Sequence, residues 1–377
     1  MGDKLKIGLD AKRAFYNCRG LGNYSRDTIR ILSEQKAENE YFLFTPKTKN
    51  AINFPLQPNC KIISPTGLLS VRVPSLWRTF GQCQEIRENK LDIYHGLSHE
   101  LPHSIKKRNV RTVVTMHDLI FLKHPELFPF FDRYLFQKKY LRSCLIADRI
   151  IAISQETKND LIEYLSIKEQ KIDVVYQGCN PLFRQPVSEE EKKRVGLKYS
   201  LPSAYLLIVC AIEKRKNHEL IINAMYRGKL DIPLVIVGHP SDYQKELLLL
   251  VSKYKLEKQV IFLHHVETSE LPAIYQLATL FLYPSFSEGF GIPILEALTS
   301  GIPVIASNAG CLKEAGGNAA LYVSSHEPEE LVNAIRSILE NKTLSDQMIA
   351  EGMLHSSLFS DENIADTLMQ TYRKTLV

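Results

Sequence analysis

This chain of 377 residues lacks a long apolar run, a marked excess of one charge and any Cys-x-x-Cys pair. No apolar stretch approaches the roughly 20 residues that cross a bilayer, so a transmembrane helix is not expected. The 47 basic and 42 acidic residues leave a net charge of +5. That imbalance is too small to indicate a nucleic-acid partner. The composition is that of an ordinary globular protein, with 45% apolar and 24% charged residues.

The cysteines and the N-terminus both favour a cytoplasmic protein. Seven cysteines are present, an odd number, and most lie in apolar runs. They are expected to be buried free thiols in a reducing compartment. The first residues, Met1-Gly-Asp-Lys-Leu-Lys6, lead directly into a strand-like run and lack the apolar core of a signal peptide.

Strand-like runs alternate with helix-like periodic segments along the whole chain. The first series includes strands at 6–10, 111–116 and 149–153, and the second includes strands at 205–210 and 280–283. Such alternation predicts parallel sheets covered by helices on both faces. The length suggests two domains. The predicted fold class is therefore α/β, with two doubly wound, Rossmann-like domains that face each other across a ligand cleft at their carboxyl strand ends.

Residues 180–203 are predicted to link the two domains. The segment carries three prolines, the charge run Glu189-Glu-Glu-Lys-Lys-Arg194 and little periodicity. The first domain is accordingly placed at 1–182 and the second at 200–359.

The run from Ser285 to Leu298 holds the most specific pattern in the chain. It reads Ser285-Phe-Ser-Glu288-Gly-Phe-Gly-Ile-Pro-Ile-Leu-Glu296-Ala-Leu298, after a strand-like segment and at the start of a helix-like one. The glycines permit a sharp turn and a close approach to a ligand, and the helix start favours an anion. Pro293 suits the first helical turn. Glu288 and Glu296 are both expected to face one ligand, with a surface glutamate pair as the alternative.

Three further loops follow predicted strands. Glu213-Lys-Arg-Lys-Asn217 sets three cations just before a helix, which suits a pyrophosphate; a solvated charge run is the alternative. His117-Asp118 follows the predicted strand that ends at Met116, again at a carboxyl edge; a packed histidine and a capping aspartate are the alternative. Arg19-Gly-Leu-Gly-Asn-Tyr24 is predicted to be a loop whose glycines let backbone N–H groups approach a phosphate or sugar, or else an ordinary turn.

Together these segments resemble the family-four, retaining, nucleotide-sugar glycosyltransferases of the GT-B architecture, over nearly the whole chain. The carrying motifs are Gly20-x-Gly22-x-Tyr24, Thr115-Met-His117-Asp118-Leu119, Ile151-Ala-Ile-Ser154, Val174-Val-Tyr-Gln-Gly178, Glu213-x-Arg215-Lys216-Asn217, Ile236-Val-Gly238 and Ser287-Glu288-Gly-Phe-Gly-Ile-Pro-Ile-Leu-Glu296-Ala297. The last is the family signature and is highly specific.

The resemblance implies roles for individual residues. Glu296 would hold the ribose of the donor nucleotide, and Glu288, Gly289, Phe290, Gly291 and Ile292 would lie by the donor sugar. Arg215 and Lys216 would neutralise the leaving diphosphate, where charge develops. Gly20 and Gly22 would close over the phosphates. His117 would line the reaction centre, with Asp118 and Tyr24 on the acceptor side. The implied catalytic set is Glu288, His117, Arg215 and Lys216.

The resemblance also implies that no metal or other cofactor takes part, and the sequence has no clustered Asp-x-Asp. Its C-terminal segment, 360–377, would return to the first domain. The chain departs from the family at three places: Cys210 replaces a common Gly, His264-His265-Val266 replaces Gly-Tyr-Val, and Asp361 replaces Trp. The first two replacements bear on the geometry expected for the pocket that holds the base of the donor nucleotide.

The favoured function is retaining transfer of a sugar, with GDP-mannose as the first candidate donor, to a growing glycan or lipid-linked acceptor in bacterial polysaccharide assembly. A GT-B nucleotide-sugar epimerase would need a further acid–base constellation in the cleft, which the sequence does not clearly offer. A non-catalytic nucleotide-sugar-binding subunit would more often have lost Glu288, Glu296 or the cation pair.

Aromatic and basic residues interleave between 128 and 142, on or near one predicted helix (131–144). The aromatics are Phe128, Phe130, Phe131, Tyr134, Phe136 and Tyr140, and the cations are Arg133, Lys138, Lys139 and Arg142. This mixture suits the anionic inner face of a membrane, so peripheral membrane contact is a hypothesis. Since the helix must also pack on its own domain, about half of these aromatics are expected in the core.

Overall fold

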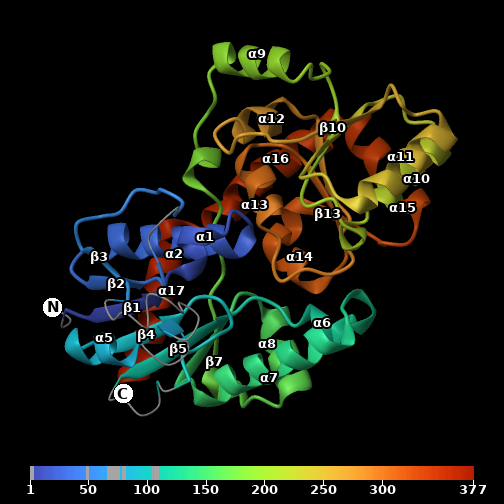
Figure 1. The fold of residues 1–377 in the computed structure, drawn as a ribbon. Helices are drawn as coiled ribbons and strands as arrows, with labels where there is room; N and C mark the ends of the chain where they lie inside the picture. Colours follow the sequence, from blue (N-terminus) through green and yellow to red (C-terminus); the bar gives the residue numbers. More distant parts are fainter. Residues whose placement is uncertain (1–3, 48–50, 66–76, 79–81, 104, 106–109) are drawn as a thin grey trace. The chain divides into compact units, whose positions relative to one another are not determined.

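The computed structural model describes residues 4–47, 51–65, 77–78, 82–103, 105 and 110–377 (Figure 1). The chain divides into two compact units, and each has its own parallel sheet. Unit 1 comprises Met1–Gly178 and Ser360–Val377, and unit 2 comprises Cys179–Phe359. Among the described residues, no helix is both long and apolar enough to cross a membrane.

Unit 1 is built on a seven-stranded sheet in the order β3-β2-β1-β4-β5-β6-β7. Its strands are β1 (Lys6–Asp10), β2 (Glu40–Phe44), β3 (Cys60–Ile63), β4 (Ile93–Gly96), β5 (Arg111–Met116), β6 (Arg149–Ala152) and β7 (Ile172–Val174). Its helices are α1 (Lys12–Tyr16), α2 (Gly20–Gln35), α5 (Cys83–Glu88), α6 (Ile120–Lys123), α7 (Phe130–Ile146), α8 (Gln155–Leu165) and α17 (Asp361–Leu376), with 3-10 turns η3 (Pro125–Leu127) and η4 (Glu169–Lys171).

Helices cover both faces of this sheet, as predicted. Successive residues of a strand point to opposite faces. Tyr94 donates its hydroxyl hydrogen to Gln82, next to α5, at 2.5 Å. His95 pairs through Nδ1 with the hydroxyl of Tyr372, on α17, at 2.8 Å on the other face. The C-terminal helix α17 is also joined to α2 by an ion pair between Arg30 and Asp361, at 2.6 Å.

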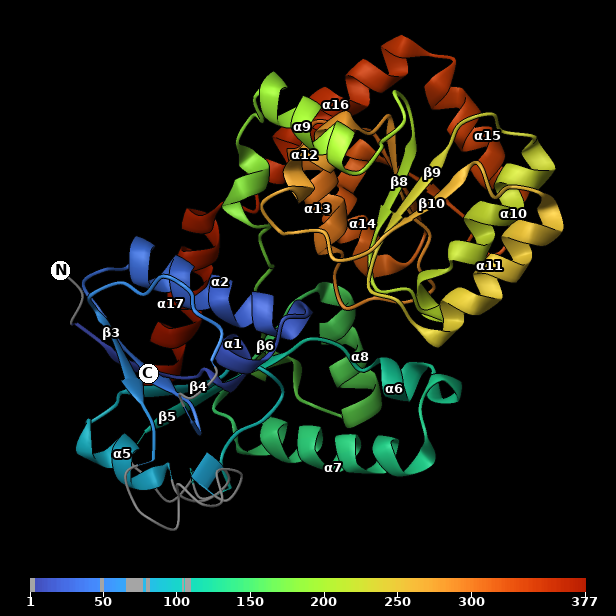
Figure 2. The same cartoon turned by 45° about the horizontal axis from the view of Figure 1, so that its top comes forward.

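Unit 2 is built on a six-stranded sheet in the order β10-β9-β8-β11-β12-β13. Its strands are β8 (Leu206–Val209), β9 (Leu234–Val237), β10 (Val260–Leu263), β11 (Leu280–Tyr283), β12 (Val304–Ser307) and β13 (Ala320–Val323). Its helices are α9 (Glu189–Lys198), α10 (His218–Gly228), α11 (Asp242–Tyr254), α12 (Leu271–Leu277), α13 (Ile292–Thr299), α14 (Gly310–Gly316), α15 (Pro328–Leu339) and α16 (Lys342–Ser357), with turns η5 (Pro181–Arg184), η6 (Lys214–Lys216) and η7 (Gly317–Ala319). Figure 2 shows α10, α11 and α15 on one side of the sheet and α13 and α14 on the other.

Both sheets have a topological switch point. In unit 1 the chain steps outward from β1 to β2 and β3, then returns to β4 on the other side of β1. In unit 2 it steps from β8 to β9 and β10, then returns to β11. Loops that leave neighbouring strands at such a point diverge to opposite faces and leave a crevice at the carboxyl ends. This topology predicts where ligands bind in each unit.

The segment expected to be a linker, 180–203, contains helix α9 and belongs to unit 2. The charge run itself forms the helix. Ser188 caps it by accepting the N–H of Glu191 at 3.2 Å, and Glu191 pairs with Arg194 at 2.7 Å. Arg194 and Lys198 then bind the buried carboxylate of Glu270, just before α12. The sequence pattern hides this helix because ionic contacts, rather than an apolar stripe, hold it in place.

Gly20 and Gly22, predicted to lie in a loop, belong to the first turn of α2. The loop prediction is wrong because a short helix, α1, already occupies the chain between β1 and this turn. A Cβ added to Gly22 would lie 1.7 Å from the carbonyl oxygen of Asn17, whereas one on Gly20 would meet nothing within 4 Å. Gly22 therefore allows the end of α1 to approach α2 closely.

Gly22→Ala should lower the free energy of unfolding of unit 1 by about 1–3 kcal/mol, because the methyl group forces α1 away from α2. Gly20→Ala is the matched control. It should leave stability unchanged or raise it by up to about 1 kcal/mol, since alanine favours a helix over glycine. Urea unfolding of the full chain, followed by circular dichroism, measures both. Equal stability of the two variants would contradict the close-approach role of Gly22.

Candidate functional site

Two predicted site loops meet at the switch point of unit 2. The chain leaving β8 enters η6, which carries Arg215 and Lys216, and the chain leaving β11 reaches Glu288. Nη1 of Arg215 lies 2.8 Å from Oε2 of Glu288, and Nζ of Lys216 lies 2.5 Å from its Oε1. All three side chains are largely buried, with 21%, 9% and 11% of their surface exposed. The structure thus brings together three of the four predicted catalytic residues.

This cluster is an ionised cation–carboxylate–cation triad. Burial opposes ionisation of Glu288, but Lys216 and Arg215 outweigh it and lower the carboxyl pKa to about 2. Burial likewise opposes the charge on Arg215, yet the carboxylate of Glu288 raises the pKa of its guanidinium. Within the triad two cations face one carboxylate, an excess of one positive charge; the half-exposed Glu213 lies 3.7 Å from Arg215 at its edge. Such a site attracts an anion. The solvated-charge-run alternative fits Lys214, which is exposed and pairs with Glu246 at 3.0 Å.

Two residues that the sequence analysis gave no role hold the cations in place. The side-chain amide of Asn217 donates to the carbonyl oxygens of Pro284 at 3.1 Å and Ser325 at 2.8 Å, which ties η6 to the loop after β11. Its backbone has a φ of 59°, a conformation that asparagine tolerates better than most residues. Tyr283 accepts a hydrogen bond from Nζ of Lys216 at 2.9 Å. For Asn217, an asparagine in a loop between a strand and a helix is the sequence signal that could have indicated this role.

Helix α13 begins directly after Glu288. Gly291 precedes it with a φ of +134°, and a Cβ there would lie 3.0 Å from Leu312. Pro293 occupies the first turn, as predicted. Phe290 is buried, with its ring centroid 5.7 Å from that of Phe359. The positive end of the helix dipole therefore lies beside the loop that carries Glu288.

Glu296 lies in the second turn of α13 and is half-buried. The hydroxyl of Tyr275 donates to its Oε2 at 2.9 Å. The ring of Tyr275 stacks on Phe281, and Phe281 stacks on Tyr283, which binds Lys216. An aromatic row thus runs beneath the site from the Glu296 carboxylate to the cation pair.

The departures from the family have clear local partners. Sγ of Cys210 lies 3.5 Å from Nε2 of His218, and burial raises the pKa of its thiol to about 12. Nδ1 of His264 donates to the carbonyl oxygen of Gly238 at 2.6 Å, so its Nε2 accepts from the Gln244 amide at 3.1 Å. Asp361 lies in unit 1 and binds Arg30.

Of the residues predicted in unit 1, His117 and Asp118 follow β5, and Tyr24 lies on α2 with Gly20 and Gly22. Nε2 of His117 donates to the carbonyl oxygen of Leu97 at 2.9 Å, and its ring meets Tyr24 edge-on with centroids 4.5 Å apart. Burial lowers the pKa of His117 to about 4, so the ring is neutral near pH 7. Asp118 accepts the N–H of Ile120 at 3.2 Å. The packed histidine and the capping aspartate of the alternative interpretation are therefore both present. These contacts do not test whether His117 and Asp118 also bind a ligand.

The cysteines and the residue types that can bind metals add no further candidate site within the described ranges. Of the seven cysteines, the six whose side chains the structure describes are free; Cys144, Cys179 and Cys311 are buried, but Cys18 is exposed, against expectation. Across the described ranges, no group of three or more His, Cys, Asp or Glu side chains is placed to hold a metal ion.

Comparisons with known proteins agree with the resemblance. Residues 189–354 match the family described as glycosyl transferases group 1, and residues 19–181 match glycosyltransferase family 4. The chain is 27% identical to O-antigen chain mannosyltransferase B of Escherichia coli, over 98% of this chain and 100% of that protein. It is 30% identical to the serotype-specific mannosyltransferase WbdA of Escherichia coli over 76% of this chain, but this match spans only 36% of WbdA.

Solved structures share the fold over nearly the whole chain. A sucrose-phosphate synthase from Thermosynechococcus elongatus superposes with a TM-score of 0.79 at 22% identity, covering 98% of this chain and 99% of that one. Anabaena HepE in complex with UDP superposes with a TM-score of 0.73 at 18% identity, covering 99% and 100%. At these identities the likeness concerns the fold.

Glu288→Gln should destabilise unit 2 by about 3–5 kcal/mol at pH 7, because it leaves two buried cations without their carboxylate. The folded-state pKa of Glu288 is depressed, so its contribution is complete above the unfolded value of about 4.5 and is lost as pH falls toward about 2. The stability difference from wild type should shrink over that window. Denaturant unfolding from pH 7 to pH 2 measures it.

Glu213→Gln is the control, since Glu213 lies 3.7 Å from Arg215 but is 48% exposed. Its substitution should change stability by less than about 1 kcal/mol. If Glu288→Gln proved equally mild at pH 7, the triad would not be the buried ionic cluster described above.

Proposed function

This chain belongs to the group 1, family 4 glycosyltransferases and has the GT-B fold, and we propose that it transfers mannose from GDP-mannose, or a similar sugar from its nucleotide, to a growing bacterial polysaccharide with retention at the anomeric carbon. The observation that carries the proposal is the buried pair Arg215 and Lys216 at the switch point of unit 2, beside the start of α13. Mannose is favoured because the relatives matched over most of this chain are named mannosyltransferases.

The cation pair suits the diphosphate of the donor. Arg215 offers a planar fork of N–H groups and Lys216 a point charge, the two ways in which proteins bind phosphate oxygens. In the structure Glu288 holds both cations in position. A bound diphosphate would take over part of this pairing and leave the carboxylate of Glu288 near the donor sugar.

Catalysis would follow from where charge develops. As the bond between the anomeric carbon and the diphosphate oxygen breaks, negative charge builds on the leaving group, and cations fixed in advance stabilise it without reorganisation. The acceptor hydroxyl oxygen forms the new bond on the same face, and its proton passes to the departing diphosphate. The two cations supply positive charge of the kind that a metal ion would provide, so we propose that no metal takes part; activity should persist in excess chelator.

The other predicted site residues would take the roles that the resemblance implies. Glu296 would accept hydrogen bonds from the ribose hydroxyls, with its second oxygen held by Tyr275. Gly20 and Gly22 would meet the phosphates, while Tyr24, His117 and Asp118 would serve the acceptor side. His117 would act as a neutral imidazole, since burial lowers its pKa to about 4.

Lys216→Ala should lower kcat/KM for sugar transfer by about 10²–10³, the loss typical of one charge-stabilising donor. Glu296→Ala should lower it by about 10–10², because the hydrogen bonds from the ribose hydroxyls to a carboxylate are lost. Incubation with a panel of nucleotide sugars, with nucleoside diphosphate release as readout and NMR of the first product for its anomer, measures this. Lys214→Ala is the control, because that lysine is 65% exposed and pairs away from Glu288. Normal transfer by either site variant, with intact circular dichroism, would contradict the assignment, and an inverted product would contradict retention.

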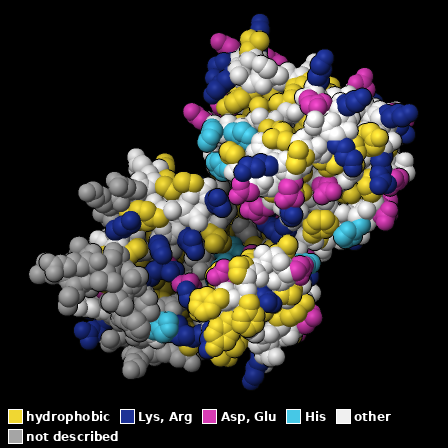
Figure 3. Space-filling view, turned by 45° about the vertical axis from the view of Figure 1, so that its right-hand side comes forward, with side chains coloured by type: hydrophobic (Ala, Val, Ile, Leu, Met, Phe, Trp, Pro, Cys, Tyr) yellow, Lys and Arg dark blue, Asp and Glu magenta, His cyan; other side chains and the backbone are white. Residues whose placement is uncertain are grey.

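We also propose that unit 1 contacts a membrane through an aromatic patch, defined as Phe130, Phe131 and Tyr134 of α7. These side chains are 76%, 68% and 45% exposed. Arg133 and Lys138 lie over two of the rings, 5.5 Å from the centroid of Phe130 and 4.2 Å from that of Tyr134. Figure 3 shows hydrophobic side chains gathered beside cations on this unit. Aromatic rings at headgroup depth beside lipid phosphates would satisfy both kinds of group.

The expected division of the aromatics is found. Phe136 and Tyr140 pack on Phe121 of α6, with ring centroids 5.8 and 5.3 Å apart, and Phe128 packs against the same core. The exposed half of the set is then available for another surface.

Phe130→Ser combined with Phe131→Ser should abolish flotation with vesicles rich in anionic lipid at low salt, because the variant loses most of its apolar insertion area. Leu248→Ser with Leu249→Ser removes two exposed leucines from α11 of unit 2 and should leave flotation unchanged. Failure of the wild-type protein to float, or equal flotation of both variants, would remove the aromatic patch as a membrane contact.

A further inference from the structure

A small cavity lies at the switch point of unit 1, between the ends of β1 and β4. Its volume is about 200 Å³, and its charged lining residues include Asp10, Arg78, Glu100, Lys138, Lys139 and Arg142. Asp10 is the last residue of β1, and Glu100 follows β4. The cavity therefore occupies the place where a doubly wound sheet is expected to bind a ligand.

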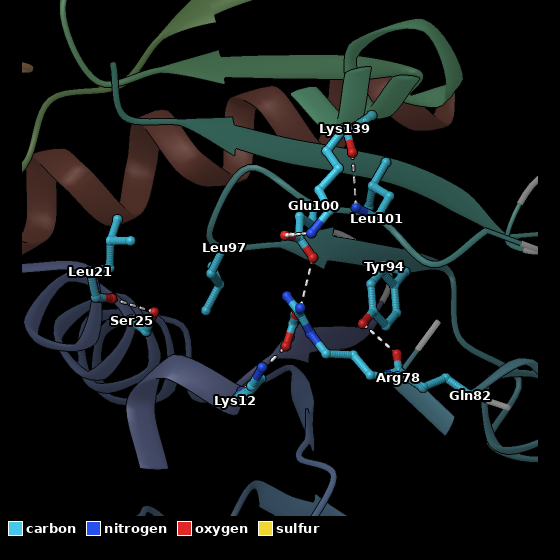
Figure 4. Close-up of polar contacts among 12 residues, drawn as sticks. Lys12, Leu21, Ser25, Arg78, Gln82, Tyr94, Leu97, Glu100, Leu101 and Lys139 are labelled. Atoms are coloured by element: carbon cyan, nitrogen blue, oxygen red, sulfur yellow. Dashed lines mark hydrogen bonds and ion pairs between the residues drawn. The ribbon is translucent and has the colours of Figure 1, made fainter. Parts of the chain in front are cut away.

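The two carboxylates are already committed to one cation. Nη2 of Arg78 lies 2.8 Å from Oδ2 of Asp10, and its Nη1 lies 2.7 Å from Oε2 of Glu100. Figure 4 shows Arg78 reaching Glu100 from one side and Lys139 approaching the same carboxylate from the other. The charge of Arg78 is thus neutralised within the protein. The two ion pairs hold this side chain in place in the lining of the cavity.

Three cations of α7 line the same cavity, and their charges are balanced by fewer carboxylate contacts than that of Arg78. Lys138, Lys139 and Arg142 lie within four residues of one another, close to one helical face. Arg142 donates to two neutral carbonyl oxygens, those of Leu101 at 3.1 Å and Pro102 at 3.4 Å. Lys138 lies over the ring of Tyr134, and Lys139 lies 3.7 Å from Glu100, which already binds Arg78.

The charges named on this cavity sum to an excess of two positive, from four cations and two carboxylates. Burial is the main cause that lowers the pKa of Lys12, next to Asp10; Arg78 and Arg13 lower it further, and Asp10 and Glu100 oppose them. Burial also lowers the pKa of His103, and Arg142 adds to the effect. A multiply charged anion would complete the site.

We propose that this cavity binds a phosphate or pyrophosphate ester group carried by the acceptor. The proposal rests on the transferase function proposed above, and it assigns the chemical class of the acceptor. Arg142 and the two lysines offer the fork and the point charges that phosphate oxygens bind. The volume is below that of pockets for drug-sized ligands and suits a small charged group whose remainder extends outward.

The phosphate ester could belong to a lipid-linked or a soluble acceptor. Tyr134 of the aromatic patch lies four residues before Lys138, about one helical turn along α7. An apolar chain attached to the phosphate would therefore find exposed aromatic rings close to the cavity. A soluble phosphate ester would use the cations alone.

The test is calorimetric titration of the full-length protein at low salt with geranyl pyrophosphate, inorganic pyrophosphate and geraniol. Both pyrophosphates should bind and geraniol should not. Tighter binding of geranyl pyrophosphate than of inorganic pyrophosphate assigns the lipid-linked source, and equal binding assigns the soluble one. Hydrogen exchange should show protection in residues 97–103 and in α7, which separates this cavity from the cations of η6.

Lys139→Gln with Arg142→Gln should weaken pyrophosphate binding at least tenfold, since charge-assisted hydrogen bonds are lost. Lys138→Gln with Lys139→Gln keeps the hydrogen bonds from Arg142 to the backbone, so it serves as the second variant should the first fold poorly. It should also weaken pyrophosphate binding. Lys168→Gln, an exposed cation of the same unit outside the cavity, is the control.

Unchanged affinity in both double variants, or protection confined to Lys214–Lys216, would overturn the proposal. Release of nucleoside diphosphate from a donor to water, measured on the same variants, should stay at the wild-type rate because unit 2 is untouched. This readout distinguishes a failure of the phosphate cavity from a failure of the transferase function.

Discussion

The buried triad of Arg215, Glu288 and Lys216 is the interaction on which the site of unit 2 depends. Two cations at the end of a strand would repel each other and draw water, but one buried carboxylate binds both and lets the loops after β8 and β11 close together. Asn217 fastens the same two loops through its side-chain amide. The excess positive charge of the triad suits an anion, so under the proposed function the contacts that hold the two loops together would also prepare the site for a diphosphate.

Each unit uses its switch point in a related way. In unit 2 the carboxylate is outnumbered by cations at the ends of β8 and β11, and in unit 1 the same is true near the ends of β1 and β4. In both, an arginine is fixed by carboxylates at or after the strand ends: Arg215 by Glu288, and Arg78 by Asp10 and Glu100. A transferase that joins a phosphorylated donor to a phosphorylated acceptor would need two anion sites of this kind, one in each unit.

The sequence predicted the parallel sheets and the family, because apolar strand runs and the Glu288–Glu296 motif are local signals. Ser154 caps α8 by accepting the N–H of Thr157 at 3.0 Å, and a serine directly before a helix is a signal of the same local kind. The sequence missed α9 because ionic contacts to Glu270 hold that helix, and it placed Gly20 and Gly22 in a loop because α1 leaves little periodic trace in five residues. The basic cavity was invisible for a different reason: Arg78, Glu100 and Arg142 are distant in sequence and meet only in the fold.

The most direct test of the central claim is a crystal structure of the protein with a nucleoside diphosphate bound. The account predicts the diphosphate against Arg215 and Lys216, with Glu288 released from at least one of the two cations and the ribose hydroxyls on Glu296. A diphosphate bound elsewhere in unit 2, with Glu288 still holding both cations, would show that the triad is structural only and would contradict the proposed catalytic role.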